Sequence, residues 1–194
     1  MQIRIRRARP TDTARIAEIH VKASQAAFEG LIPPAEIDGL CVHEMARRWA
    51  PLTLLHGGFF VAEDDEPRGF CLVTRGRAEP PGSPTAELMA LYVDPDRQSQ
   101  GIGTQLMDAA LRHAANRRFT ELMLWVLPGN RRACRFYESF GFDTDQVSRL
   151  DHGLRTAAPH LQYRLSLGTA CARVQRLPPG RPLTGTGGQH RHRL

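Results

Sequence analysis

The stretch that decides the fold is Leu88-Met-Ala-Leu-Tyr-Val-Asp-Pro-Asp-Arg-Gln-Ser-Gln-Gly-Ile-Gly-Thr-Gln-Leu-Met107. Its first six residues, 88–93, are apolar or aromatic without a polar break, which is typical of a strand covered on both faces. Pro95 stops this strand, because proline cannot donate a hydrogen bond to a sheet. From Ile102 onward, apolar residues recur at helical spacing. The stretch therefore predicts a buried strand, a sharp turn and the start of a helix.

Gly101 and Gly103 lie at the predicted N-terminus of that helix. The first N–H groups of a helix have no partner within it and the dipole is positive there, so a phosphate or pyrophosphate fits without any lysine. A plain turn explains the two glycines as well. A dinucleotide-binding fingerprint is excluded because Leu106 stands where its third glycine belongs, and the Gly-Lys-Ser/Thr of a Walker loop is absent.

A second motif follows at 124–142, with the sequence Leu124-Trp-Val-Leu-Pro-Gly-Asn-Arg-Arg-Ala-Cys-Arg-Phe-Tyr-Glu-Ser-Phe-Gly-Phe142. The first motif, from Gln98 to Gly103, is similar to the acetyl-CoA pyrophosphate loop Arg/Gln-x-x-Gly-x-Gly/Ala of the GCN5-related N-acetyltransferases. The second resembles the downstream half of the same family's pattern. Two motifs in the right order and at the right distance are far more specific than either alone. The resemblance covers residues 1–167.

The resemblance implies an α/β (α+β) acyl-CoA N-acyltransferase (GNAT) fold, with a mixed central sheet flanked by helices, and acetyl-CoA as co-substrate. In that fold two neighbouring strands, here ending at Val93 and Leu127, splay apart and admit the pantetheine arm. The arm pairs with the main chain of the first strand like an added strand. The residues that the resemblance assigns to coenzyme binding are Leu91, Tyr92, Val93, Gln98, Ser99, Gln100, Gly101, Ile102, Gly103, Thr104, Asn130 and Tyr137.

Transfer of an acetyl group from a thioester to a primary amine needs a base for the amine and a proton donor for the leaving thiolate. By the resemblance, Tyr137, seven residues after Asn130, is the general acid. Glu87, six residues before Val93, is the candidate base, and its alternative interpretation is a solvated charge beside a proline-rich loop. Acetyltransferases of ribosomal-protein N-termini carry a glutamate where Trp125 stands here, which disfavours that type.

The acceptor is implied only as an amine of a small molecule or a protein. In the family, the region of the first two helices borders the acceptor pocket, so Phe28, Leu31 and Trp49 are candidates for its wall. Plain core packing is the alternative for each of them. Two other functions stay open: a sensor of the same fold that binds acyl-CoA without turnover, and a nucleic-acid-binding module that uses an arginine-rich tail.

That tail, residues 168–194, carries five of the six net positive charges and no acidic residue. Its Gly, Pro and Arg content predicts a disordered, solvated segment outside the fold, so no specific nucleic acid is expected as a partner. The remaining residues, 1–167, form one predicted acetyltransferase domain, since 194 residues with 41% hydrophobic content suit a single globular core.

Composition also bears on location and metal binding. No apolar run approaches the roughly 18 residues of a membrane span, and the charged N-terminus predicts no signal peptide, so we expect a cytoplasmic protein. The four cysteines are far apart and predict buried free thiols. We expect no metal site. Relatives of the family often form dimers, which leaves a homodimer open.

Along the chain, the patterns predict the order β, α, α, β, β, β, α, β, α, β, β. Thr11 is a candidate N-cap for the first helix, and Pro51 is expected to close the second helical region. The expected strands are 2–8, 58–63, 68–75, 88–93, 121–127, 142–147 and 161–167, and the expected helices are 12–27, 34–49, 101–118 and 130–141.

Overall fold

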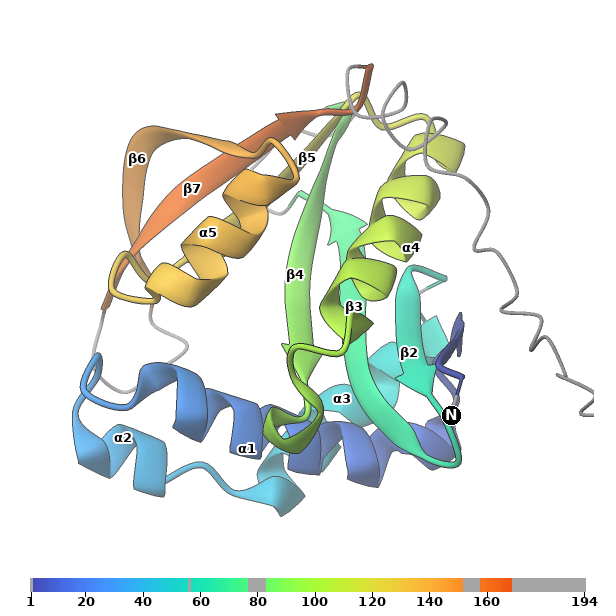
Figure 1. Ribbon diagram of the computed structural model, residues 1–194, viewed down its shortest axis with the longest axis vertical. Coiled ribbons are helices and arrows are strands. Elements are labelled where there is room, and N and C mark those ends of the chain that lie inside the picture. Colours follow the sequence, from blue (N-terminus) through green and yellow to red (C-terminus); the bar gives the residue numbers. More distant parts are fainter. Residues whose placement is uncertain (1, 56, 77–82, 152–157, 169–194) are drawn as a thin grey trace, which may run out of the picture.

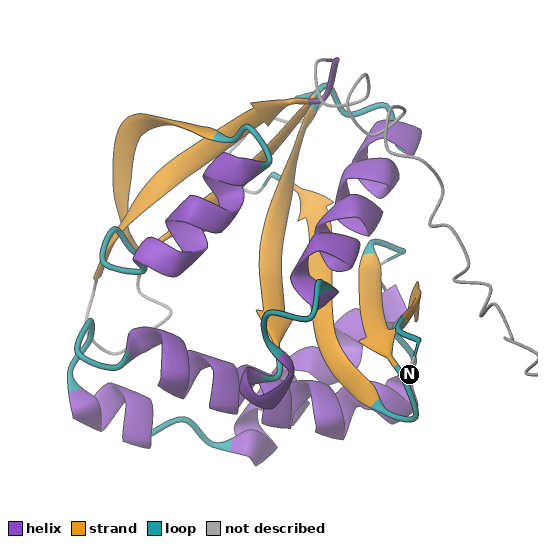
Figure 2. Ribbon diagram, in the orientation of Figure 1, coloured by secondary structure: helices purple, strands orange, loops and turns teal. Residues whose placement is uncertain are grey.

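The computed structural model describes residues 2–55, 57–76, 83–151 and 158–168. They form one seven-stranded mixed sheet flanked by helices (Figure 1; Figure 2). The predicted fold class is therefore confirmed. The strands are β1 (Arg4–Arg7), β2 (Phe59–Glu63), β3 (Pro67–Arg75), β4 (Thr85–Val93), β5 (Glu121–Val126), β6 (Asp143–Asp151) and β7 (Ala158–Ser166). The helices are α1 (Thr13–Phe28), α2 (Pro34–Asp38), α3 (Val42–Leu55), α4 (Ile102–Asn116) and α5 (Arg131–Ser139), with 3-10 turns η1 (Pro10–Asp12) and η2 (Pro95–Arg97).

The strand order across the sheet is β1-β2-β3-β4-β5-β7-β6. Neighbouring strands are antiparallel except β4 and β5, which run parallel because α4 crosses over between them. The strands predicted at 88–93 and 121–127 are therefore neighbours at the centre of the sheet. This adjacency brings the two sequence motifs together.

Two apolar cores cover the two faces of the sheet. On one face α4 and α5 pack against β4 and β5, around fully buried residues such as Leu106 and Leu124. On the other face α1 and α3 pack against β2 to β4, around Ile16, Phe59 and Phe70. Figure 1 shows α4 and α5 in front of the sheet and α1 and α3 across its lower end. Any opening through the sheet centre is therefore bordered by helices from both faces.

The helical region predicted at 34–49 is two helices, and the prediction that Pro51 ends it was wrong. Gly39 follows the short α2, and α3 continues through Pro51 to residue 55. Proline removes one helical hydrogen bond, but Trp49 and Thr53 on either side of it are buried. Their packing holds the helix across the proline.

The prediction that Thr11 caps the first helix was also wrong. A 3-10 turn precedes α1, and the group that ties it down is the Asp12 carboxylate. This carboxylate accepts hydrogen bonds from the Arg9 N–H at 2.7 Å and from the Arg6 guanidinium at 2.7 and 2.8 Å. A charged partner on β1 thus outcompetes the neutral cap.

Three further outcomes concern single segments. Residues 169–194, which include most of the predicted tail, lie outside the described residues, so the division of the chain at residue 167 stays a prediction. The three described cysteines are free, but only Cys71 is buried and Cys41 is exposed, so the prediction of buried thiols was wrong for Cys41. Within the described residues, no helix is both long and apolar enough to cross a bilayer.

Candidate active site

The site begins where β4 and β5 separate. The two strands pair over only three residues each, and the last pair is Glu87 with Met123. Beyond it, residues 88–93 of β4 pair only with β3, and residues 124–126 of β5 pair only with β7, within the described sheet. The inner edges of both strands therefore carry backbone N–H and C=O groups without a sheet partner. This is the gap that the family resemblance implied.

A cavity of about 980 Å³ occupies the gap, at the upper end of the range for cofactor and ligand sites. Residues of α1 and α3 line it from one face of the sheet, and residues of α4 and α5 line it from the other. One ligand can therefore enter from each face and meet the other at the strands.

A β-bulge shapes the β4 edge of the cavity. Leu72 of β3 pairs with Ala90, but Val73 pairs with Leu88, so Met89 is an extra residue in β4. A bulge bends a strand and redirects its neighbouring groups. Here it lies where β4 loses its pairing with β5, and Met89 lines the cavity.

The bend after β4 is held in an unusual backbone conformation. Ser99 and Gly101 have φ values of 62° and 76°, in the left-handed region that glycine adopts without cost. Gly101 is the N-cap of α4, and no side chain of the described residues caps this helix. The N–H groups of its first turn consequently stay open toward the cavity, as anion binding at a helix N-terminus requires.

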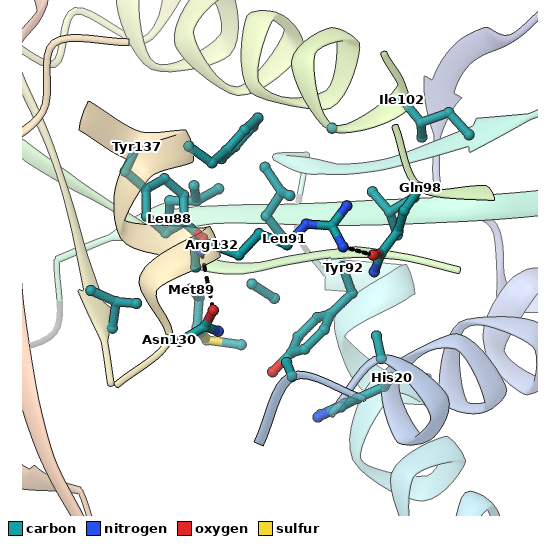
Figure 3. Close-up of a pocket in the computed structure, with 18 of the residues that line it drawn as sticks. His20, Leu88, Met89, Leu91, Tyr92, Gln98, Ile102, Asn130, Arg132 and Tyr137 are labelled. Atoms are coloured by element: carbon teal, nitrogen blue, oxygen red, sulfur yellow. Dashed lines mark hydrogen bonds between the residues drawn. The ribbon is translucent and has the colours of Figure 1, made fainter. Parts of the chain in front are cut away.

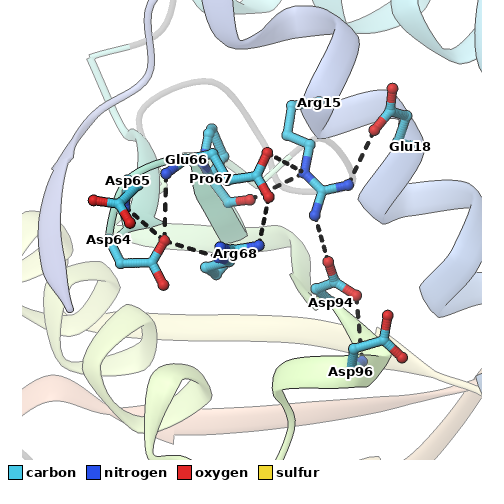
Figure 4. Close-up of polar contacts among 9 residues, drawn as sticks. All are labelled: Arg15, Glu18, Asp64, Asp65, Glu66, Pro67, Arg68, Asp94 and Asp96. Atoms are coloured by element: carbon cyan, nitrogen blue, oxygen red, sulfur yellow. Dashed lines mark hydrogen bonds and ion pairs between the residues drawn. The ribbon is translucent and has the colours of Figure 1, made fainter. Parts of the chain in front are cut away.

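An ion-pair network holds the start of this bend against α1 (Figure 4). The Asp94 carboxylate is almost fully buried and accepts from the Arg15 guanidinium of α1 at 2.5 Å. Asp94 also accepts from the Asp96 N–H at 3.3 Å, while Arg15 donates to the Pro67 carbonyl at 3.2 Å. Helix α1, the β2–β3 turn and the start of the bend are thereby tied together.

The first turn of α5 closes the opposite side of the bend (Figure 3). Asn130 caps this helix by accepting from the Ala133 N–H at 3.1 Å, and it lines the cavity. The Arg132 guanidinium donates to the Gln98 side-chain oxygen and, at 3.5 Å, to the Ser99 hydroxyl. Sequence reasoning missed Arg132. Its position in the sequence gave an indication. A positive side chain in the first turn of a helix is unfavourable next to the helix dipole, so such a residue often has a partner or a ligand elsewhere.

Glu87 and Tyr137, the two candidate catalytic residues, both line the cavity. Glu87 is buried, with 4% of its surface exposed, so the interpretation of Glu87 as a solvated charge is wrong. Tyr137 is half-buried and stacks edge-on against Phe136 and Phe142. Burial raises the pKa of its phenol above the ordinary value, and the nearby Tyr92 adds to the effect. The hydroxyl therefore stays protonated at neutral pH, the form that a proton donor needs.

The α1–α3 end of the cavity is formed by side chains. Phe28 and Trp49 line it, as expected for an acceptor wall. His20 stacks on Tyr92 with 4.6 Å between ring centroids and accepts the Trp49 indole N–H at 2.9 Å. Leu31 lies outside the lining, because it is exposed and covers the loop after β5, where a Cβ on Gly129 would come within 2.5 Å of it.

Most of the residues that were predicted to bind the coenzyme lie together around this cavity. All of the coenzyme residues predicted above line the cavity except Gln100, which is exposed on the outside of the bend. Five charged or imidazole side chains that line it were not predicted from the sequence: His20, Arg48, Arg97, Arg132 and His160. For His20, Arg48 and His160 no local motif exists, because helix and strand packing alone brings them to the cavity.

Comparison with known proteins decides the family. Residues 27–142 match the Acetyltransferase (GNAT) family. The chain belongs to this family. The predicted family, the enzyme class of N-acetyltransferase and acetyl-CoA as co-substrate are thereby confirmed. One relative, named "Probable N-acetyltransferase Rv2775", from Mycobacterium tuberculosis, is 29% identical over 168 residues, or 84% of this chain and 93% of the relative.

Two other N-acetyltransferases are similar over different spans. The N-acetyltransferase YuaI of Bacillus subtilis is 28% identical over 71% of this chain and 79% of its own length. Among solved structures, the PaiA N-acetyltransferase of Thermoplasma acidophilum, in complex with coenzyme A, superposes with a TM-score of 0.69 at 20% identity. It matches 86% of this GNAT chain and 99% of its own. The likeness at this identity establishes the shared fold.

Proposed function

We propose that the cavity binds acetyl-CoA and transfers its acetyl group directly to a primary amine of a small molecule or a protein. The observation that carries the proposal is the separation of β4 from β5 after three residue pairs, with open α4 amides at one end of the gap. The diphosphate binds those amides and the Arg132 guanidinium. The pantetheine arm pairs with Leu91, Tyr92 and Val93, and the Asn130 side chain borders its path.

The chemistry follows from two groups that line the cavity, the Glu87 carboxylate and the Tyr137 hydroxyl. The neutral amine attacks the thioester carbonyl, a C–N bond forms and the C–S bond breaks. Glu87 takes the proton that the amine nitrogen releases, through water, and the Tyr137 hydroxyl protonates the departing sulfur. No covalent enzyme intermediate is needed, since both substrates meet in the same gap.

An amine-panel screen that follows free thiol release tests this function. Acetyl-CoA should also raise the melting temperature by mass action, with about 2.7 kcal/mol of added stability at 100 times Kd. A protein that shows this shift but acetylates no amine would be an acyl-CoA sensor. A protein that shows no shift would contradict the coenzyme site itself.

Glu87→Gln tests the assignment of the base. The amide has nearly the same shape as the carboxylate but cannot take a proton, so we expect kcat/KM to fall by about 100-fold. The decline of kcat/KM at low pH should shift as well. The coenzyme-induced shift in melting temperature should persist, and an unchanged rate would remove Glu87 from the mechanism.

A further inference from the structure

The α1–α3 end of the cavity has a composition that points to a class of acceptor. On α3, Met45, Trp49 and Leu52 lie on one helical face, and all three line the cavity. On α1, the lining residues include the small side chains of Ala23 and Ala27, which leave room between the helices. This end therefore forms an apolar groove with space for a side chain of the acceptor.

His20 presents one hydrogen-bond donor inside this groove. Its Nδ1 atom accepts the Trp49 indole N–H at 2.9 Å. Burial, with the nearby Arg48 charge, lowers the pKa of His20 to about 4, so the imidazole is neutral at pH 7. A neutral imidazole that accepts at Nδ1 carries its proton on Nε2. Stacking on Tyr92 fixes the ring in place (Figure 3).

Arg48 supplies a positive charge at the same end. It follows Met45 on the cavity face of α3, and its charge is close enough to affect His20. No carboxylate of the described residues forms an ion pair with it. Among the described lining residues, Glu87 is the one carboxylate, and it lies where the strands separate rather than in the groove.

We infer that the acceptor is a monoamine that also bears a carboxylate and an apolar side chain, as free apolar amino acids do. The Arg48 guanidinium and the His20 Nε2–H bind the carboxylate, the groove holds the apolar side chain, and the amine faces Glu87. This inference rests on the proposed function and narrows its acceptor. Polyamines and other polycations are disfavoured, because their additional charges meet Arg48 instead of a carboxylate.

Matched acceptors test the inference through their rates of thiol release. The series is phenylalanine, its amide, 2-phenylethylamine and spermidine. We expect kcat/KM for phenylalanine to exceed that for the amide by about tenfold, the size of one charge-assisted contact. The difference should shrink at 0.5 M salt, because the Arg48 side chain is exposed. Equal values for acid and amide, or a preference for spermidine, would overturn the inference.

Two variants assign the effect to residues. Arg48→Gln should raise KM for phenylalanine to the level of its amide, while Arg47→Gln, an exposed neighbour outside the cavity lining, should not. His20→Phe keeps an aromatic ring against Tyr92 but loses the donor. It should raise KM for the acid and the amide, which both offer an oxygen, by a larger factor than KM for 2-phenylethylamine, which offers none. If the Arg48→Gln variant still preferred phenylalanine to its amide, the assignment of the carboxylate contact to Arg48 would be overturned.

A binding measurement separates this inference from the proposed function. In the presence of coenzyme A, N-acetylphenylalanine should raise the melting temperature more than N-acetylphenylalaninamide does. If acetyl-CoA stabilises the protein and some amine is acetylated, but the carboxylate gives no advantage in binding or rate, the inference fails and the proposed function stands. If acetyl-CoA gives neither a thermal shift nor turnover, both fail.

Discussion

The two ends of the cavity differ in the kind of group that they offer. At the α4–α5 end the groups available to a ligand are mainly peptide N–H and C=O groups, along 91–93 and at the open first turn of α4. At the α1–α3 end they are side chains: His20, Arg48 and the apolar lining. The first kind of site fixes a backbone shape and suits a constant coenzyme. The second is built from side chains on two helices, so single substitutions there can change which ligand fits.

Gly101→Val should give the largest effect, because it changes the α4–α5 end of the cavity at the residue whose backbone conformation is most restricted. A Cβ at this position meets nothing within 4 Å, so any damage comes from the left-handed φ of 76° rather than from a clash. A β-branched residue can adopt that conformation only at a cost of about 1–3 kcal/mol. We expect the bend to change and the thermal shift with acetyl-CoA to disappear.

Gly101→Asn is the matched control for that variant. Asparagine tolerates the left-handed region far better than valine, so most of the coenzyme-induced shift should survive. If both variants lost the shift equally, the side chain itself would be excluding the ligand, and backbone conformation would not explain the glycine.

Tyr137→Phe should come next, with kcat lower by about 100-fold, or 2.7 kcal/mol, since a general acid contributes at least that much. Coenzyme affinity should change much less than kcat, because the ring packing is kept. The raised pKa of Tyr137 moves its deprotonation to higher pH, so wild-type kcat should show no basic limb from this group below about pH 10. An unchanged kcat in the variant would remove Tyr137 from the acid role.

Arg15→Met should lower the free energy of unfolding by about 2 kcal/mol, because it leaves the buried Asp94 carboxylate without its charge partner. Chemical denaturation measures the loss. The double variant with Asp94→Asn should regain most of it, since asparagine can still accept the Asp96 N–H. Coenzyme affinity should fall with the single variant and return with the double. A single variant as stable as wild type would show that the network does not hold the bend.

Arg132→Gln should give the smallest effect, a rise of about fivefold in KM for acetyl-CoA, or 1 kcal/mol. The side chain is exposed, so the loss should diminish as salt is raised. Arg131→Gln removes the same charge from the preceding residue, which lies outside the cavity lining, and should change KM little. Similar effects of the two variants would indicate general electrostatic attraction rather than a contact of Arg132 with the diphosphate.

The same difference between the two ends explains what the sequence could predict. The bend at 98–104 and the helix start after Asn130 are local, so each appears as a contiguous motif. The structure places every residue of the bend except Gln100 against the cavity, together with Asn130. The acceptor end joins residues of α1 and α3 that are about thirty positions apart, so no contiguous pattern marks His20 or Arg48. Leu31 was wrongly predicted to line the acceptor wall for the same reason. The direction of the chain after α1 turns its side chain toward Gly129, and no local pattern in the sequence encodes that direction.

The edges along which β4 and β5 no longer pair with each other also bear on the stability of the protein in the cell. Exposed strand edges are the segments through which sheets add foreign strands and aggregate. Because the pantetheine arm would occupy one of these edges, the bound coenzyme also works as a missing strand of the sheet. The chain should therefore resist proteolysis and self-association best when acetyl-CoA is plentiful, so that its abundance follows the supply of its own substrate.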